Sequence, residues 1–252
     1  MTDGPADSAG VPFEGRAFHP NPAAGDDGTA PPKLLEAIRR FKAKELGIAD
    51  VVAALHGERL LIPLVAVRGD EGVGAHGQTV DKTQELSIVT VAGPDGRAVL
   101  PAFTSAAAMK TWNPDARPIP IEATRVALAV ASEGTQLIII DPKSPTELVI
   151  RHPAFRALAT GEPWTPCFDD EAVLDRFLAA AADEPAVRAI QLAPGDPSAR
   201  LAGAELLVQL TLDAGLDQPA LDALLTRLRT AWAADEFIAT HVDSVALRVD
   251  RL

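Results

Sequence analysis

The fold of this chain is decided by residues 86–112, which read LSIVTVAGPDGRAVLPAFTSAAAMKTW. Two apolar segments, 86–91 and 97–103, flank a turn at 93–96. In such a turn proline presets its own φ, and glycine accepts a positive φ. The pattern therefore predicts two antiparallel strands joined by this turn.

A short helix is expected directly after this hairpin. Ser105 stands where the helix begins, and its hydroxyl can accept a hydrogen bond from a free amide of the first turn. The helix should run through Trp112 and end before Pro114. Apolar periodicity predicts the other elements of this half of the chain, which are helices at 33–46, 50–56, 121–132 and 152–160 and strands at 60–67, 137–140 and 147–150.

Two of these strands carry a further signal. The strand at 137–140 is continuously apolar, which predicts burial on both faces. The strand at 60–67 contains Pro63, which has no amide hydrogen and so favours a sheet edge or a bulge at that point.

The second half of the chain is separated from the first by residues 161–169, GEPWTPCFD, which interrupt every periodicity and predict a domain boundary. Residues 205–213 alternate between apolar and polar side chains, as in a strand with one wetter face. The other elements expected here are a helix at 171–182, a strand at 187–192, a helix capped by Asp217 and a last strand at 245–249.

We therefore expect an α+β protein with two small modules of mixed sheet and helix, at 33–161 and 170–252. Residues 1–32 are rich in proline, glycine and acidic residues and cannot bury enough apolar surface to offset chain entropy. We expect a disordered arm there and a flexible loop at 69–84.

Composition excludes several classes of protein. The net charge of -12 leaves no basic face for a phosphate backbone, so we expect no nucleic-acid partner. The single cysteine, Cys167, excludes an internal disulfide and cysteine-rich zinc sites. The N-terminal residues do not resemble a signal peptide, and the apolar run at 60–67 is far too short to span a membrane. We expect a soluble, cytoplasmic protein that does not bind a membrane.

Three apparent motifs have simpler interpretations. Residues 72–77 spell G-x-G-x-x-G, but a strand rather than a helix is expected to follow, so a loop is favoured over a phosphate site. Ser105, Asp141 and His152 occur in the order of a hydrolase triad, but Ser105 lacks the G-x-S-x-G turn and suits a helix cap. Cys167 has no neighbouring base, which favours inert packing, and the five histidines show no metal-binding spacing, so neither metal nor cofactor is expected.

The chain resembles the SseB family. In the first half, the apolar strand at 60–67, the Pro-Ala-Phe-Thr-Ser run at 101–105, Trp112 and the Ile-Ile-Ile-Asp-Pro run at 138–142 resemble the SseB N-terminal domain. In the second half, residues 187–194, 205–216 and 243–247 are similar to the C-terminal module of actinobacterial members. The resemblance covers nearly the whole chain after Lys33 and implies no catalytic residue.

Two functions remain open from the sequence. The first is a non-catalytic cytosolic interaction or regulatory protein, favoured because no reactive groups cluster, with an unidentified protein partner and an undetermined oligomeric state. The alternative is a small-molecule-binding protein or an enzyme with its site between the modules. The candidate ligand-binding residues are Phe103, Ser105, Trp112 and Asp141.

Overall fold

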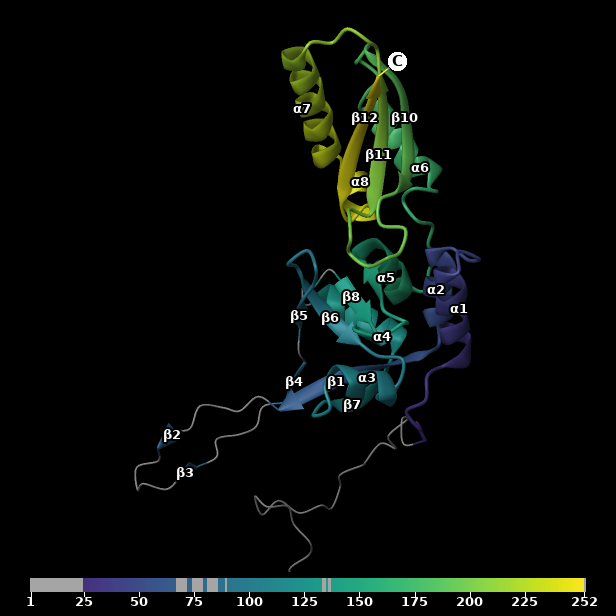
Figure 1. Cartoon of the computed structure of the whole chain (residues 1–252), viewed down its shortest axis with the longest axis vertical. Coiled ribbons are helices and arrows are strands. Elements are labelled where there is room, and N and C mark those ends of the chain that lie inside the picture. Colours follow the sequence, from purple (N-terminus) through teal and green to yellow (C-terminus); the bar gives the residue numbers. More distant parts are fainter. Residues whose placement is uncertain are drawn as a thin grey trace, which may run out of the picture.

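The structure of the chain is a computed structural model, and it describes residues 25–132 apart from 67–71, 74–78, 81–85 and 89, together with residue 135 and residues 137–251. Most of the expected arm, most of the expected loop at 69–84 and residues 74–77 of the glycine-rich motif lie outside the described residues. Helices and mixed sheets confirm the predicted α+β class (Figure 1). No helix in the described ranges is both long and apolar enough to cross a membrane.

The first part of the chain builds two larger sheets, with strand orders β4-β1-β7 and β5-β6-β8-β9. A bridge between Leu61 of β1 and Phe103 links them. The short strands β2 (Gly72–Val73) and β3 (Thr79–Val80) pair with each other and with no other described strand. The remaining elements are α1 (Pro32–Lys42), α2 (Ile48–Leu55), β1 (Arg59–Ala66), β4 (Leu86–Ile88), β5 (Val91–Ala92), β6 (Ala98–Ala102), α3 (Ala106–Trp112), β7 (Arg117–Glu122), α4 (Ala123–Ser132), β8 (Leu137–Ile140), β9 (Leu148–Arg151) and α5 (His152–Thr160).

Two predicted elements are wrong in their extent. The strand expected at 86–91 is split, because β4 pairs with β1 whereas β5 pairs with β6 across the turn. A continuous apolar run does not show where a chain leaves one sheet for another. The helix expected at 121–132 begins only at Ala123, because the residues before it form β7 beside β1. Pro118 and Pro120 conceal this strand, since proline is rare within sheets.

Helices cover one face of the sheet β5-β6-β8-β9. Apolar side chains of β6, β8 and β9, such as Leu100, Ile138 and Ile150, share one core with side chains of α1, α2, α4 and α5. Phe155 of α5 is fully buried in this core. Gly161 ends α5 with a φ of 74°, a left-handed conformation that glycine adopts without strain.

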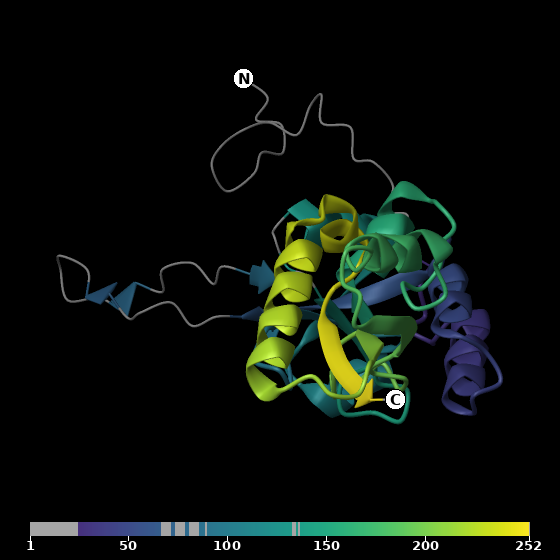
Figure 2. The same cartoon turned by 90° about the horizontal axis from the view of Figure 1, so that it is seen from above.

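The second part of the chain is a three-stranded sheet with its own core (Figures 1 and 2). Its strands are ordered β10-β11-β12, with β11 antiparallel to β10 and parallel to β12. The predicted alternation is confirmed in β11, where every second side chain is buried. The elements are α6 (Glu171–Ala179), β10 (Val187–Pro194), β11 (Leu206–Leu212), α7 (Gln218–Ala234), α8 (Glu236–His241), which the sequence analysis missed, and β12 (Val245–Arg251).

Residues 195–205, which we call the junction loop, connect β10 to β11 and pack on the first part of the chain. Ala199 belongs to the core under α1 and α5, and Leu201 packs with Val99 and Ile139 on the opposite face of the same sheet. Both loop residues have positive φ, 49° and 56°. The loop explains why β8 is buried on both faces, as its sequence predicts.

The cap of α3 yields a prediction. Ser105 has extended backbone dihedrals, and its Oγ accepts a hydrogen bond from the amide of Ala108 at 3.1 Å. Replacing Ser105 with alanine should lower the free energy of unfolding by about 1 kcal/mol, and glycine should cost only a few tenths. Urea denaturation of the two variants measures both. Equal losses for alanine and glycine would contradict a capping role.

Candidate functional site

The predicted candidate residues Phe103, Ser105 and Trp112 lie in or next to α3, Ser105 directly before its first residue and Trp112 at its end. Phe103 is fully buried, and its ring centroid lies 5.3 Å from that of Trp112. Ser105 is the helix cap. The structure thus brings Phe103, Ser105 and Trp112 together, and their role in ligand binding stays a prediction.

Asp141 is joined to this group through Thr104. Its Oδ1 accepts a hydrogen bond from the Thr104 amide and its Oδ2 one from the Thr104 hydroxyl, each at 2.7 Å. Oδ2 also accepts from the Thr146 hydroxyl at 2.7 Å. The side chain is fully buried and both oxygens are occupied, so Asp141 fixes the turn after β8. Within the described residues, no hydrogen bond joins Asp141 to Ser105 or His152 in the manner of a catalytic triad.

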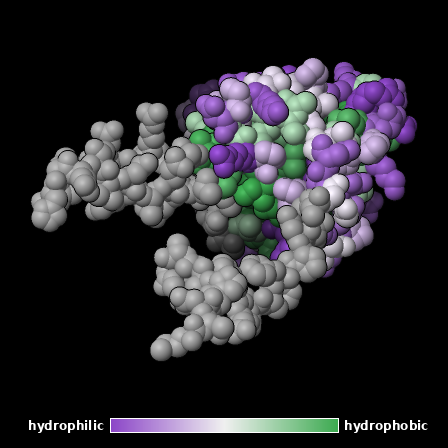
Figure 3. Space-filling view, turned by 90° about the horizontal axis from the view of Figure 1, so that it is seen from below, coloured by the Kyte–Doolittle hydropathy of each residue, from purple (hydrophilic) through white to green (hydrophobic). Residues whose placement is uncertain are grey.

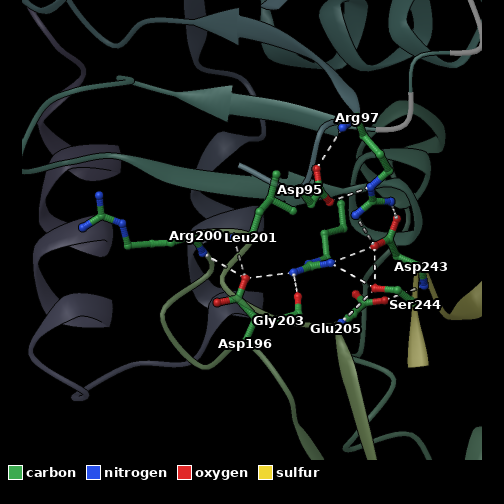
Figure 4. Close-up of polar contacts among 10 residues, drawn as sticks. Asp95, Arg97, Asp196, Arg200, Leu201, Gly203, Glu205, Asp243 and Ser244 are labelled. Atoms are coloured by element: carbon green, nitrogen blue, oxygen red, sulfur yellow. Dashed lines mark hydrogen bonds and ion pairs between the residues drawn. The ribbon is translucent and has the colours of Figure 1, made fainter. Parts of the chain in front are cut away.

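A larger set of charged side chains lies where the two parts of the chain meet (Figure 4). At its centre is Arg151, the last residue of β9, whose side chain is only 7% exposed. Its Nη1 donates to Asp243 Oδ2 at 2.8 Å and to Ser244 Oγ at 3.2 Å. Its Nη2 donates to Asp196 Oδ2 and to the carbonyl of Gly203, both at 2.8 Å. One guanidinium therefore ties β9 to the junction loop and to the start of β12.

A second arginine completes this cluster. Arg97, from the turn between β5 and β6, donates from Nη1 and Nη2 to the two oxygens of Asp243 at 2.7 and 3.0 Å. Its Nε donates to Asp95 at 2.7 Å. Burial alone would raise the pKa of Asp243, but hydrogen bonds from Arg97, Arg151 and Ser244 outweigh it and lower the pKa. Asp243 therefore stays ionised between two guanidinium groups.

The pKa of Glu205, another carboxyl of this cluster, is shifted in the opposite direction to that of Asp243. Its Oε2 accepts the amide of Asp243 at 2.6 Å, and the residue is 7% exposed. Burial raises the pKa of Glu205 to about 7. Burial, reinforced by the nearby Glu205 carboxylate, also raises the pKa of the Cys167 thiol. Cys167 is therefore held as a protonated thiol, which is a poor nucleophile.

A cavity of about 160 Å³ opens beside the cluster, between the two parts of the chain. We call it the junction cavity. Three charged residues of the cluster, Arg151, Asp196 and Glu205, reach its wall. The rest of the lining is mainly apolar and includes Phe41, Ile48, Ala154, Trp164, Phe168 and Pro197.

The charged groups of the cluster form a closed network, in which they hydrogen-bond to one another and to nearby backbone groups. Throughout the part of the chain that the structure describes, every buried side-chain nitrogen and oxygen has a hydrogen-bond partner. In the same residues, no group of three or more histidine, cysteine, aspartate or glutamate side chains is placed to hold a metal ion. The arrangement is suited to holding two modules together, because its charges satisfy one another.

Sequence reasoning missed this cluster. Arg151 and Asp243 are 92 residues apart, and no local pattern links them. One feature of the sequence indicates a buried charge: Arg151 directly follows the apolar run Leu148, Val149 and Ile150. A charge at the end of a buried strand needs a counter-charge, but the sequence does not say which one.

The raised pKa of Glu205 gives a pH dependence. The native state keeps this proton at pH values where the unfolded chain has lost it, so stability falls as pH rises from about 4.5 to about 7. The total loss should be roughly 3 kcal/mol. Glu205→Gln removes this titration, so the variant should gain stability relative to wild type across that window. Urea denaturation at pH 4.5, 6 and 8 measures it, and an equal difference at all three values would contradict it.

Comparison with known proteins identifies the family of the first part. The family model described as the SseB protein N-terminal domain matches residues 33–157. No curated protein and no solved structure matches. The matched residues run from α1 into α5 and include Arg97 and Arg151. The acidic residues of the cluster other than Asp95 lie after the matched residues. The resemblance of the C-terminal module to the SseB family therefore stays a prediction. The chain carries an SseB N-terminal domain and belongs to the SseB family.

Proposed function

We propose that this SseB-family protein is a cytoplasmic, non-catalytic interaction or regulatory protein that works by binding another protein. The observation that carries the proposal is an open groove of about 810 Å³ in the first part of the chain, between β1, β7 and α4. Apolar side chains form its floor, among them Ile62, Leu100, Pro120, Ile121 and Val126. Figure 3 shows apolar residues gathered on the underside of the molecule, where β1 and β7 lie.

The chemistry of the groove suits an apolar segment of a protein. Charged residues of both signs also line it, namely Glu58, Glu122 and Arg125 together with the ion pair of Asp26 and Arg59. Ile119, on the same face of β7 as Ile121, is 36% exposed, and Leu128 of α4 is 63% exposed. Large apolar side chains exposed beside an apolar groove are typical of a protein-binding surface. The closed network at the junction supports a role without catalysis, since its charged groups already bind one another.

The proposal predicts a contact at Ile119. A photo-crosslinking amino acid at this position should capture a partner from native lysate, whereas the same residue in place of Leu178, which is 43% exposed in the second part, should not. With the captured protein purified, Ile119→Asp should weaken binding at least tenfold, roughly the effect of removing one apolar anchor.

Leu178→Asp is the matched control and should leave the affinity within about twofold. Calorimetric titration measures both variants, and circular dichroism checks that they are folded. Equal losses from the two substitutions, or none from Ile119→Asp, would overturn the groove as the binding surface.

The junction cavity favours a second candidate function, the binding of a small molecule between the modules. It combines aromatic walls with the carboxyl of Glu205, which is a hydrogen-bond donor when protonated. A ligand there should be a compact apolar molecule with one hydrogen-bond acceptor. A thermal-shift screen of such fragments should give hits that raise the melting temperature of wild type but not of Trp164→Ala. Hits unaffected by this substitution would remove the cavity from consideration.

A further inference from the structure

The strand edges of this molecule are protected in several ways. Leu61 exchanges hydrogen bonds with Phe103, so the peptide groups of Leu61 point away from β7. Its partner in β7 is Pro120, and the next such pair is Pro63 with Pro118. In an antiparallel pair such opposed residues both point outward. The two prolines of β7 therefore remove donors only from the outer edge and leave the pairing with β1 intact.

The same argument about the direction of the missing amide hydrogen applies to Pro63 of β1. Its missing donor also points away from β7, at a place where no described strand pairs with β1, between the bridge of Leu61 to Phe103 and the pairing of Leu64 with Ile88 of β4. The sequence predicts an edge or a bulge at Pro63, and although β1 is the middle strand of β4-β1-β7, this point on its β4 side has no described neighbour.

Other edges are covered or interrupted. The outward amide of Val149 in β9 donates to the carbonyl of Ala199 in the junction loop at 2.7 Å. In β10 the register shifts between Val187 and Ala189, and Pro194 lacks a donor at the other end. The edge strands β4 and β5 have three and two residues. Bulges, prolines, short strands and covering loops are the usual means of blocking further pairing.

In the part of the chain that the structure describes, the edge of β12 has none of these protections. The amide of Leu206 donates to the carbonyl of Ser244, and Leu206 is in register with Val245. In a parallel pair this places the peptide groups of Ala246, Arg248 and Asp250 toward β11. The peptide groups of the alternate residues, Val245, Leu247, Val249 and Arg251, point outward, and no other described strand pairs with them.

An apolar groove lies beside this edge. It has a volume of about 380 Å³ and is formed by α7, α8 and β12. Figures 1 and 2 both show α7 lying beside β12. Val245, which lines the groove, is 43% exposed, and Asp243 and Ser244 add polar groups at the end of the groove where β12 begins. The lining includes Trp232, Ala233, Ile238, Val242 and Leu247, with Arg229 at the rim. An additional strand paired with β12 would lay every second side chain over this surface.

The charged side chains beside this edge indicate which kind of strand could pair with β12. Arg248 and Arg251 are exposed on β12 and Arg229 is exposed on α7, whereas Asp250 is the single acidic side chain on the strand. Arg248 donates from Nε to Asp250 and from Nη2 to Gln209, each at 3.1 Å, so three arginines stand against one aspartate and the edge keeps a net positive charge. A second copy of the chain, paired antiparallel over the full length of β12, would set Arg248 opposite its own equivalent. Like charges directly opposite each other destabilise a sheet. An acidic residue at that place would be attracted instead.

We propose that the outer edge of β12 binds an extended segment of another protein as a fourth strand of the sheet, with an acidic residue opposite Arg248 and small apolar side chains over the groove. Main-chain hydrogen bonds supply the affinity of such a complex, and the side chains supply its specificity. This surface lies on a different part of the chain from the groove at Ile119, so each can fail without the other.

The test uses a fluorescein-labelled probe peptide, Thr-Val-Glu-Val-Glu-Val-Thr with blocked ends, and the same peptide with lysine in place of glutamate. Fluorescence anisotropy should show saturable binding of the glutamate peptide to the full-length protein, with the lysine peptide roughly tenfold weaker. Hydrogen exchange followed by NMR should slow at the amides of Leu247 and Val249. The amides of Ile190 and Leu192, on the β10 edge, should not change.

Variants test the edge directly. Arg248→Glu should reverse the preference between the two peptides, whereas Arg188→Glu, a matched exposed arginine on β10, should not. Val249→Pro removes an outward donor without touching the ladder to β11 and should abolish binding. Ile119→Asp should leave peptide binding unchanged.

Three results would overturn the proposal. The first is the absence of saturable binding by the wild type. The second is slower exchange at the β10 edge instead of the β12 edge. The third is a mass of two chains by light scattering that Val249→Pro reduces to one, which would mean that a second copy fills the edge.

Discussion

The guanidinium of Arg151 is the interaction on which the arrangement of the two modules depends. It is buried between Asp196 and Asp243, so β9, the junction loop and the start of β12 meet at one point. Removing one partner of a buried ion pair costs about 3–5 kcal/mol, a large share of a typical stability of about 5–15 kcal/mol. Because apolar residues of similar volume often replace such pairs without loss, we interpret the cluster as a device that selects one docking geometry. Positive φ values at Ala199 and Leu201 fit this view, since contacts with the first module hold both residues.

The sequence predicts well the elements whose formation depends on neighbouring residues in the chain alone. The strand at Leu137–Ile140 is apolar throughout, β11 alternates strictly, and Ser105 and Asp217 cap their helices through their own side chains. The strand β7 could not be predicted, because Pro118 and Pro120 are compatible with a sheet only when their missing donors face solvent. That condition depends on the register with β1, which the sequence does not contain.

The side chains of the candidate site and of the charged cluster also differ in how far the sequence predicts them. Phe103, Ser105, Trp112 and Asp141 could be grouped from sequence because a hairpin, a short helix and a strand end bring them together. The charged cluster could not, because its arginines come from the first module and its acidic residues mainly from the second. Buried ion pairs are chosen by the final packing of distant segments. The properties of such groups, including the high pKa of Glu205, therefore become visible only in the folded chain.

The spacing of the two prolines in β7 limits how this strand can evolve. Side chains and peptide groups alternate with a period of two along a strand. Deleting or inserting one residue between Pro118 and the start of α4 would turn a missing donor from solvent toward β1 and place Ile119 or Ile121 on the opposite face. Substitutions at the outward positions are compatible with the ladder, whereas a change of length is not. The length of β7 should therefore vary less among relatives than its composition.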